Sequence, residues 1–85
     1  MTINAQLFAA AGQALFGEEW KRPLAALLGM NGRTVFRIAA AARDGADYPV
    51  NPDLGPILAD HLAQRAAQAE AQAKEARRLM KLLAE

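Results

Sequence analysis

Side chains able to form paired hydrogen bonds are concentrated in one short stretch of the chain, at Asn31, Arg33, Thr34 and Arg37. An arginine guanidinium presents a planar fork of N–H donors, and an asparagine amide offers a donor beside an acceptor. These geometries fit phosphate oxygens and the edges of nucleic-acid bases, where arginine pairs with guanine and asparagine with adenine. Taken alone, Arg33 and Arg37 fit an ordinary solvated helix face, and they favour contact with nucleic acid only if a helix-turn-helix pattern presents them on an exposed face.

The charges of the chain are unevenly distributed, although its net charge is only +1. Residues 20–43 contain five basic residues and no acidic one, whereas the rest has five basic residues against nine acidic ones. The five basic residues are Lys21, Arg22, Arg33, Arg37 and Arg43. A net charge this small does not draw the whole molecule to nucleic acid, so any such attraction depends on this segment.

The 85 residues are rich in alanine and poor in β-branched residues, which predicts a single all-α domain with a small core. Apolar residues at three- and four-residue steps predict three short helices, over about residues 3–16, 19–28 and 33–43. Thr2 and Asn31 are the expected N-caps of the first and third helices, and a glycine follows each of the three.

A long C-terminal helix follows the turn-forming residues of the loop 44–53. It is expected to start at Asn51 and Pro52 and to reach about Ala84, a length of roughly 50 Å at 1.5 Å per residue. The chain is thus divided into residues 1–48, expected to bind DNA, and residues 49–85, expected to dimerise.

The spacing of small and apolar residues in the segment 24–38 fits a helix-turn-helix motif. The motif needs a small residue on its first helix, a glycine four residues later, and apolar residues six and nine positions beyond that glycine. The residues at these positions are Ala25, Gly29, Val35 and Ile38. On the second helix Val35 and Ile38 should therefore face the core, while Arg33 and Arg37 share an opposite, exposed face.

The segment also resembles small bacterial and phage helix-turn-helix regulators of the repressor type, closely over about residues 14–38 and loosely over 7–62. The matching elements are Ala14-Leu15-Phe16-Gly17, Trp20, Leu24-Ala25, Leu28-Gly29, Arg33-Thr34-Val35 and Arg37. Two departures concern the second helix, in which Ile38 stands where many members have tryptophan and Ala39–Arg43 continue before the closing glycine. This helix is therefore expected to be longer than in the family.

The resemblance implies transcriptional regulation by sequence-specific binding of double-stranded DNA, with the helix after Asn31 in the major groove. The expected base-reading residues are Asn31, Arg33, Thr34 and Arg37. The expected contacts to the DNA backbone come from Lys21, Arg22, Gly32 and Arg43. Trp20 and Phe16 are expected in the core, and Phe36 against the long helix.

The long helix carries an unbroken apolar seam that predicts pairing with a second helix, and hence a homodimer. The dimerisation residues expected on it are Leu62, Ala66, Ala69, Ala73, Ala76, Met80 and Leu83, preceded by Ala59. A neighbouring register through Leu58, Arg65, Gln72 and Leu79 ranks second because it buries Arg65 and Gln72. A solvated single helix is the simpler alternative, and the sequence favours neither parallel nor antiparallel pairing.

Enzymatic chemistry has little support, because the chain has no serine, no cysteine and one histidine, His61. We expect a non-enzyme without metal or other cofactor, located in the cytoplasm, since no apolar run has the length of a membrane span. Two alternatives stay open beside the DNA-binding regulator. One is a phage-type inhibitor or adaptor that binds a protein partner with the same helical fold, and the other is a scaffolding coiled coil.

Overall fold

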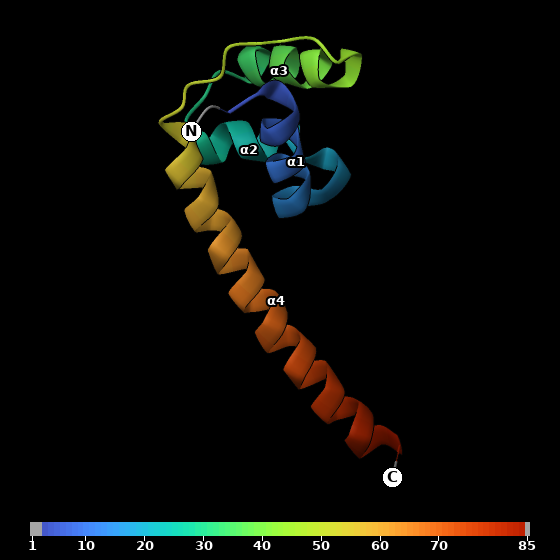
Figure 1. Ribbon diagram of the computed structural model, residues 1–85. Helices are drawn as coiled ribbons and strands as arrows, with labels where there is room; N and C mark the ends of the chain where they lie inside the picture. The colour runs from blue at the N-terminus through green and yellow to red at the C-terminus, as the bar shows by residue number, and fades with distance from the viewer. Residues whose placement is uncertain (1–2, 85) are drawn as a thin grey trace.

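The computed structural model describes residues 3–84, and every regular element in this range is helical (Figure 1). The elements are α1 (Ala5–Phe16), the short 3-10 helix η1 (Gly17–Glu19), α2 (Lys21–Leu28), α3 (Gly32–Asp44) and α4 (Leu54–Ala84). Helices α1 to α3 form a body at one end of the molecule, and α4 extends away from it (Figure 1). The prediction of an all-α fold that ends in a long helix is confirmed.

Glycines end the three shorter helices as predicted, and Gly17, Gly29 and Gly45 all have a positive φ that favours glycine. Gly29 after α2 and Gly45 after α3 have φ of 65° and 69°, in the left-handed region that is costly for other residues. In both turns the backbone N–H of the next residue donates to a carbonyl five residues earlier, Met30 to Ala25 at 2.9 Å and Ala46 to Ala41 at 2.8 Å. This Schellman arrangement satisfies carbonyls that the helix end would leave without donors.

The predicted start of the first helix was wrong. The N-cap of α1 is Asn4, whose Oδ1 accepts a hydrogen bond from the Leu7 N–H at 2.7 Å. Ile3 therefore precedes the helix and is nevertheless buried, while Thr2 lies outside the described residues. Two polar residues close to the expected start competed as caps, and Asn4 is among the stronger N-cap residue types.

The second helix and the long helix also start later than predicted. Glu19 belongs to η1, so that α2 begins only at Lys21. Asn51 accepts a hydrogen bond from the Asp53 N–H at 3.0 Å and thereby closes a turn around Pro52, after which α4 begins at Leu54. The Leu54 N–H donates to the Asn51 carbonyl three residues earlier at 3.1 Å, which is the hydrogen bond of a turn and not of an α-helix.

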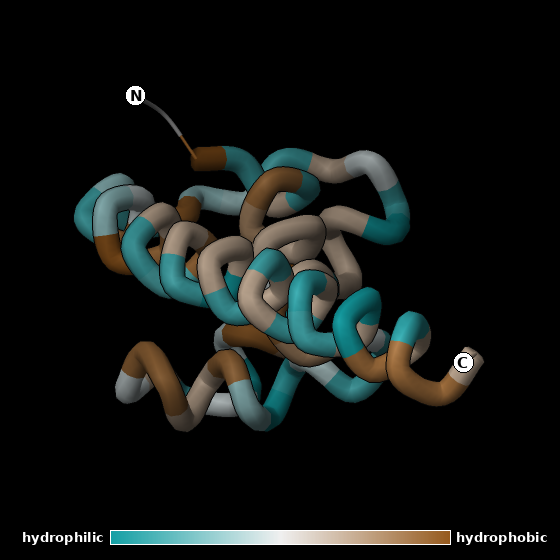
Figure 2. The backbone as a smooth tube through the Cα atoms, turned by 90° about the horizontal axis from the view of Figure 1, so that it is seen from below, coloured by the Kyte–Doolittle hydropathy of each residue, from teal (hydrophilic) through white to brown (hydrophobic). Residues whose placement is uncertain are grey.

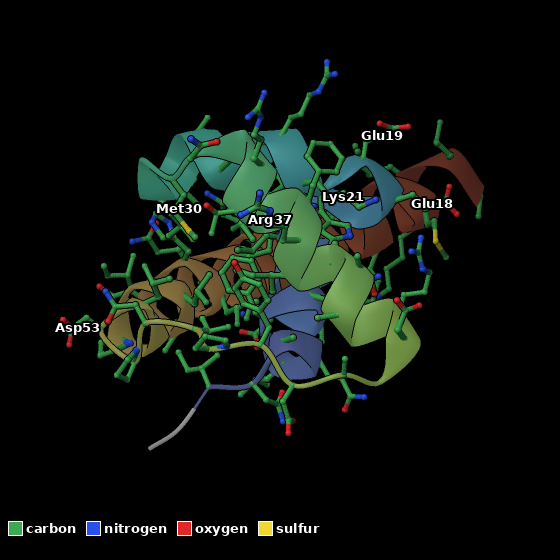
Figure 3. All side chains as sticks on the ribbon, turned by 90° about the horizontal axis from the view of Figure 1, so that it is seen from above. Glu18, Glu19, Lys21, Met30, Arg37 and Asp53 are labelled. Carbon is green, nitrogen blue, oxygen red and sulfur yellow. The ribbon has the colours of Figure 1, made fainter. Side chains whose placement is uncertain are left out.

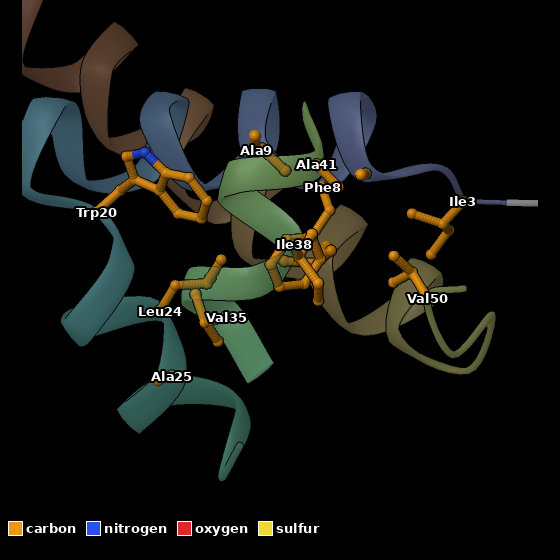
Figure 4. Packing of buried hydrophobic residues seen from close by; sticks show 13 residues of the cluster. Ile3, Phe8, Ala9, Trp20, Leu24, Ala25, Val35, Ile38, Ala41 and Val50 are labelled. Carbon is orange, nitrogen blue, oxygen red and sulfur yellow. The ribbon is translucent and has the colours of Figure 1, made fainter. Parts of the chain in front are cut away.

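The core lies between α1, α2 and α3, where Phe8, Leu24, Val35 and Ile38 are fully buried (Figure 4). Trp20 joins them and meets the ring of Phe8 edge to face, with ring centroids 6.2 Å apart. These contacts confirm that Val35 and Ile38 form the inner edge of α3 and that Trp20 belongs to the core.

Phe16, which was expected in the core, is instead exposed over 39% of its surface. Trp20 packs against α1 at Gly12, where a side chain would collide with the indole ring. Phe16 lies one helical turn beyond this contact, at the end of α1, so the packed surface is already filled before the chain reaches it.

Helix α4 touches the body only through its first turns. Leu58 is its one buried residue among those described, and Leu54 and Leu62 pack against the core as half-buried neighbours. Nearly every side chain from Ala63 onward is exposed. Despite its length, α4 is too polar to cross a membrane. No other helix in residues 3–84 is long and apolar enough to do so.

Candidate nucleic-acid interface

Helix α3 is divided lengthwise into an apolar edge and a basic edge. Val35 and Ile38 are buried against α1 and α2, while Arg33 and Arg37 are exposed on the other side. Figure 3 looks onto this side, with Arg37 on α3 and Lys21 beside it. The two guanidinium groups therefore lie on the surface, as the helical spacing requires.

The connection from α2 to α3 fixes where the basic edge begins. After the left-handed turn at Gly29, the half-buried Met30 packs against the core and holds the connection in place. Asn31 then caps α3, since its Oδ1 accepts a hydrogen bond from the Arg33 N–H at 2.9 Å. The Asn31 side chain thus has a structural task at the same place where it was expected to read a base.

Gly32 and Thr34 lie in the first turn of α3 and are both half-buried. A Cβ atom built on Gly32 would meet no heavy atom within 4 Å, and the residue does not have a positive φ. The fold therefore does not require glycine at this position, and the space above it is open to a ligand that approaches the backbone closely.

Phe36 was expected to pack against the long helix, and this prediction was wrong. Its ring is 46% exposed, and the Lys21 ammonium lies 5.3 Å from the ring centroid. Phe36 therefore faces the start of α2, where Lys21 lies, and α4 leaves the body elsewhere (Figure 1). The contact is a cation–π interaction, which steadies the lysine beside the basic edge of α3. Sequence reasoning missed it because a lysine and a phenylalanine fifteen residues apart carry no local signal.

We refer to Lys21, Arg22, Arg33 and Arg37 as the basic face. Arg22 lies exposed in the first turn of α2, and Lys21 is half-buried at its start. Within residues 3–84 none of the four forms an ion pair. The three arginines of the basic face therefore have no ionic partner among the described residues, whereas Lys21 lines a pocket that also contains Glu18.

Arg43 lies near the far end of α3 and lines the same pocket as Lys21 and Phe36. Its Nε lies 3.5 Å from the Asp44 carboxylate, and both side chains are largely exposed. Such an exposed pair contributes little to stability, but it places a negative charge directly beside the arginine. Of the five basic residues predicted to meet DNA, Arg43 is thus the least suited to do so.

The remaining candidate residues are distributed along α4 or do not gather into a site. The residues predicted for dimerisation, from Leu62 to Leu83, lie along α4, and His61 is half-buried near its base. No cluster of three or more histidine, cysteine, aspartate or glutamate side chains suited to a metal ion occurs among the described residues.

A comparison of the chain with protein-family models, with curated proteins and with solved structures found no match.

Proposed function

We propose that the protein is a transcriptional regulator that binds double-stranded DNA with α3 in the major groove. The observation that carries the proposal is the basic edge of α3, where Arg33 and Arg37 are exposed and unpaired while Val35 and Ile38 anchor the opposite edge. The preceding α2 and the glycine turn correspond to the first helix and the turn of a helix-turn-helix motif.

The spacing of the two arginines suits positions that are two base-pair steps apart on a duplex. Arg33 and Arg37 are four residues apart, which is about 6 Å along a helix axis. Two base-pair steps of B-DNA measure roughly 7 Å along the duplex. Each guanidinium can therefore reach its own guanine O6 and N7, while Thr34 and the free amide nitrogen of Asn31 serve neighbouring bases or phosphates.

Contacts to the DNA backbone come from the other end of the same surface. Lys21 and Arg22 begin α2, where they neutralise phosphates and fix the register of the protein on the duplex. Lys21 is held by the Phe36 ring, and Gly32 leaves room for a phosphate at the positive end of α3.

The regulator acts as a homodimer joined through α4, so that two copies of α3 read an inverted repeat. Half-site centres are then about 34 Å apart, one turn of B-DNA, or a multiple of it. The two-fold symmetry of the dimer then matches the two-fold symmetry of an inverted-repeat operator.

Selection from a pool of random-sequence duplexes, followed by binding measurements at several salt concentrations, tests the proposal. We expect affinity to fall steeply with salt, and Arg33→Ala and Arg37→Ala each to relax specificity at particular base pairs by about 1–3 kcal/mol. Arg77→Ala on α4 is the matched control and should leave specificity unchanged. Failure to enrich any sequence, with no salt-dependent binding, would exclude the function.

One observation favours a second candidate, a phage-type inhibitor or adaptor that binds an acidic protein. The exposed Phe36 ring lies beside Lys21 and offers an apolar contact next to positive charge, a combination found in protein interfaces. This function predicts a stoichiometric complex that Phe36→Ala abolishes, and no enrichment of any duplex sequence.

A further inference from the structure

The far half of α4 exposes large apolar side chains that the rest of the chain does not cover. Met80 is 67% exposed and Leu83 is 85% exposed, and Leu79 and Leu82 also face solvent. Figure 2 shows this apolar end of the helix projecting from the body. Exposed apolar patches of this kind typically mark interaction sites.

The apolar surface continues along α4 to its base. There it enters a groove of about 580 Å³ between α1 and the first turns of α4. Leu7 and Ala11 line the groove from α1, and Ala59 and Leu62 line it from α4. Ala59 and Leu62 are also the first two members of the seam that ends at Met80 and Leu83, so the groove and the exposed patch belong to one continuous surface.

We propose that this surface binds a second copy of the chain, with the two α4 helices parallel and in register. The seam through Ala59, Leu62, Ala66, Ala69, Ala73, Ala76, Met80 and Leu83 of one copy then faces the same residues of the other. The choice of a second copy and of its direction depends on two independent observations, one of charge and one of orientation.

The charges that flank the seam favour the parallel direction. Arg65 and Glu70 flank the seam on either side. In a parallel pair, a residue at the position of Arg65 lies beside the residue five positions further along in the other copy, which is Glu70. Symmetry makes two such pairs. In an antiparallel pair with the same seam, Ala69 faces Ala73, and Glu70 lies beside Glu70 of the second copy, which is repulsive.

The orientation of the basic face favours the same direction, and this step rests on the proposed function. Figure 1 places α3 at the opposite end of the molecule from the C-terminus of α4. Figure 3, seen from the α3 side, has Arg37 toward the viewer, so the basic edge points away from that C-terminus. Parallel pairing turns both basic edges to one side, where a single duplex reaches both, whereas antiparallel pairing points them in opposite directions.

Parallel pairing also limits the spacing of the two DNA sites. The chain measures 22 Å across in both directions perpendicular to its long axis. Two copies side by side span about twice this width, which accommodates half-sites one DNA turn of about 34 Å apart but not two turns apart. The operator should therefore have half-sites one turn apart.

Cysteine cross-linking distinguishes the two directions, because the chain contains no cysteine of its own. Helix axes 8–10 Å apart bring the Cα atoms of facing seam residues to roughly 4–5 Å, within the range of a disulfide. In the parallel pair Ala66 faces Ala66, so we expect Ala66→Cys to form a covalent homodimer on mild oxidation. In the antiparallel pair Ala66 faces Ala76, and the two copies of residue 66 are about 15 Å apart along the helices.

A charge variant gives a second test whose sign differs between the two directions. Glu70→Gln removes two attractive pairs from the parallel dimer, so its dissociation constant should rise by about two- to thirty-fold at low salt. In the antiparallel dimer the same change removes a repulsion and should tighten the association. Asp60→Asn is the matched control on the same helix, off the seam and in no ion pair among the described residues, and should leave the dissociation constant unchanged within about two-fold.

The outcomes separate this inference from the proposed function. Cross-linking of Ala66→Cys together with weaker association of Glu70→Gln supports the parallel dimer. Cross-linking only in a mixture of Ala66→Cys and Ala76→Cys, or a chain that remains monomeric, overturns it, even if wild type selects a DNA sequence. A cross-linked dimer that enriches no sequence from the random duplex pool overturns the proposed function and leaves the pairing intact.

Discussion

Replacing Gly12 by alanine should destabilise the body and disturb the basic face from within. Gly12 lies in α1, where an added Cβ atom would collide with the Trp20 ring and lie 3.0 Å from Leu24 Cδ2. The residue has no positive φ, so alanine suits the backbone and only the space is lacking. Since Trp20 immediately precedes Lys21, a displaced indole shifts the start of α2 and two members of the basic face with it.

The change in the free energy of unfolding caused by Gly12→Ala follows from two opposing contributions. Forcing an extra carbon into a packed core costs about 1–3 kcal/mol, and three neighbouring atoms within 3.0 Å place Gly12 in the upper part of this range. Alanine gains about 0.5–1 kcal/mol over glycine inside a helix. The net loss is about 1–2 kcal/mol, which corresponds to a fall in Tm of roughly 4–16 °C for a domain of this size.

Trp20 is the only tryptophan of the chain, so its fluorescence reports the melting of the contact directly. Wild type and Gly12→Ala are compared at one protein concentration, because the proposed association would also stabilise the fold. Gly32→Ala is the matched control, since its Cβ atom would meet nothing within 4 Å, and its Tm should not fall. A Gly12→Ala variant as stable as wild type would show that Trp20 does not pack on α1 as described.

Three further predictions concern the turns and helix ends. Gly29→Ala should cost about 1–2 kcal/mol in chemical denaturation, because its φ of 65° strains the backbone although the space around it is empty; an unchanged midpoint would contradict the left-handed turn. Asn31→Ala should lose about 0.5–2 kcal/mol by removing the cap of α3, whereas Asn31→Asp should keep stability and weaken DNA binding by its negative charge; equal stability of all three proteins would refute the capping role. The Arg78 guanidinium donates hydrogen bonds to Glu75 at 2.6 and 3.1 Å and so lowers the pKa of this carboxyl from 4.5. This contribution to α4 is present above pH 4.5 and is lost as the pH falls through the lowered value, so wild type should lose a little helicity on acid titration by circular dichroism that Glu75→Gln does not lose.

The elements of the body could be predicted because local rules determine them. Gly29 and Gly45 end helices through backbone conformation, and Asn31 caps α3 through a hydrogen bond only two residues long. The inward and outward edges of α3 follow directly from helical periodicity, which is why Val35 and Arg37 lie where they were expected.

The errors arose where the outcome depends on contacts between distant segments. Phe16 ends α1 and stays exposed, whereas Trp20 packs on α1 at Gly12, and this contact between separate elements has no local signal in the sequence. Phe36 meets Lys21 rather than α4 because of the path that α4 takes from the body. The start of α4 was misplaced because Asn51 and Pro52 form a good helix cap and an equally good turn.

The freestanding stretch of α4 beyond Ala63 has a consequence for how the molecule responds to its own abundance. Most helical stability in proteins comes from packing of an apolar face, which this stretch lacks in a single chain, so it should fray in dilute solution and become ordered if two chains pair as proposed. Folding of α4 beyond Ala63 and formation of the dimer would then occur together. Occupancy of a paired operator would vary with the square of the chain concentration at low abundance, so small changes in synthesis or turnover would act as a steep genetic threshold.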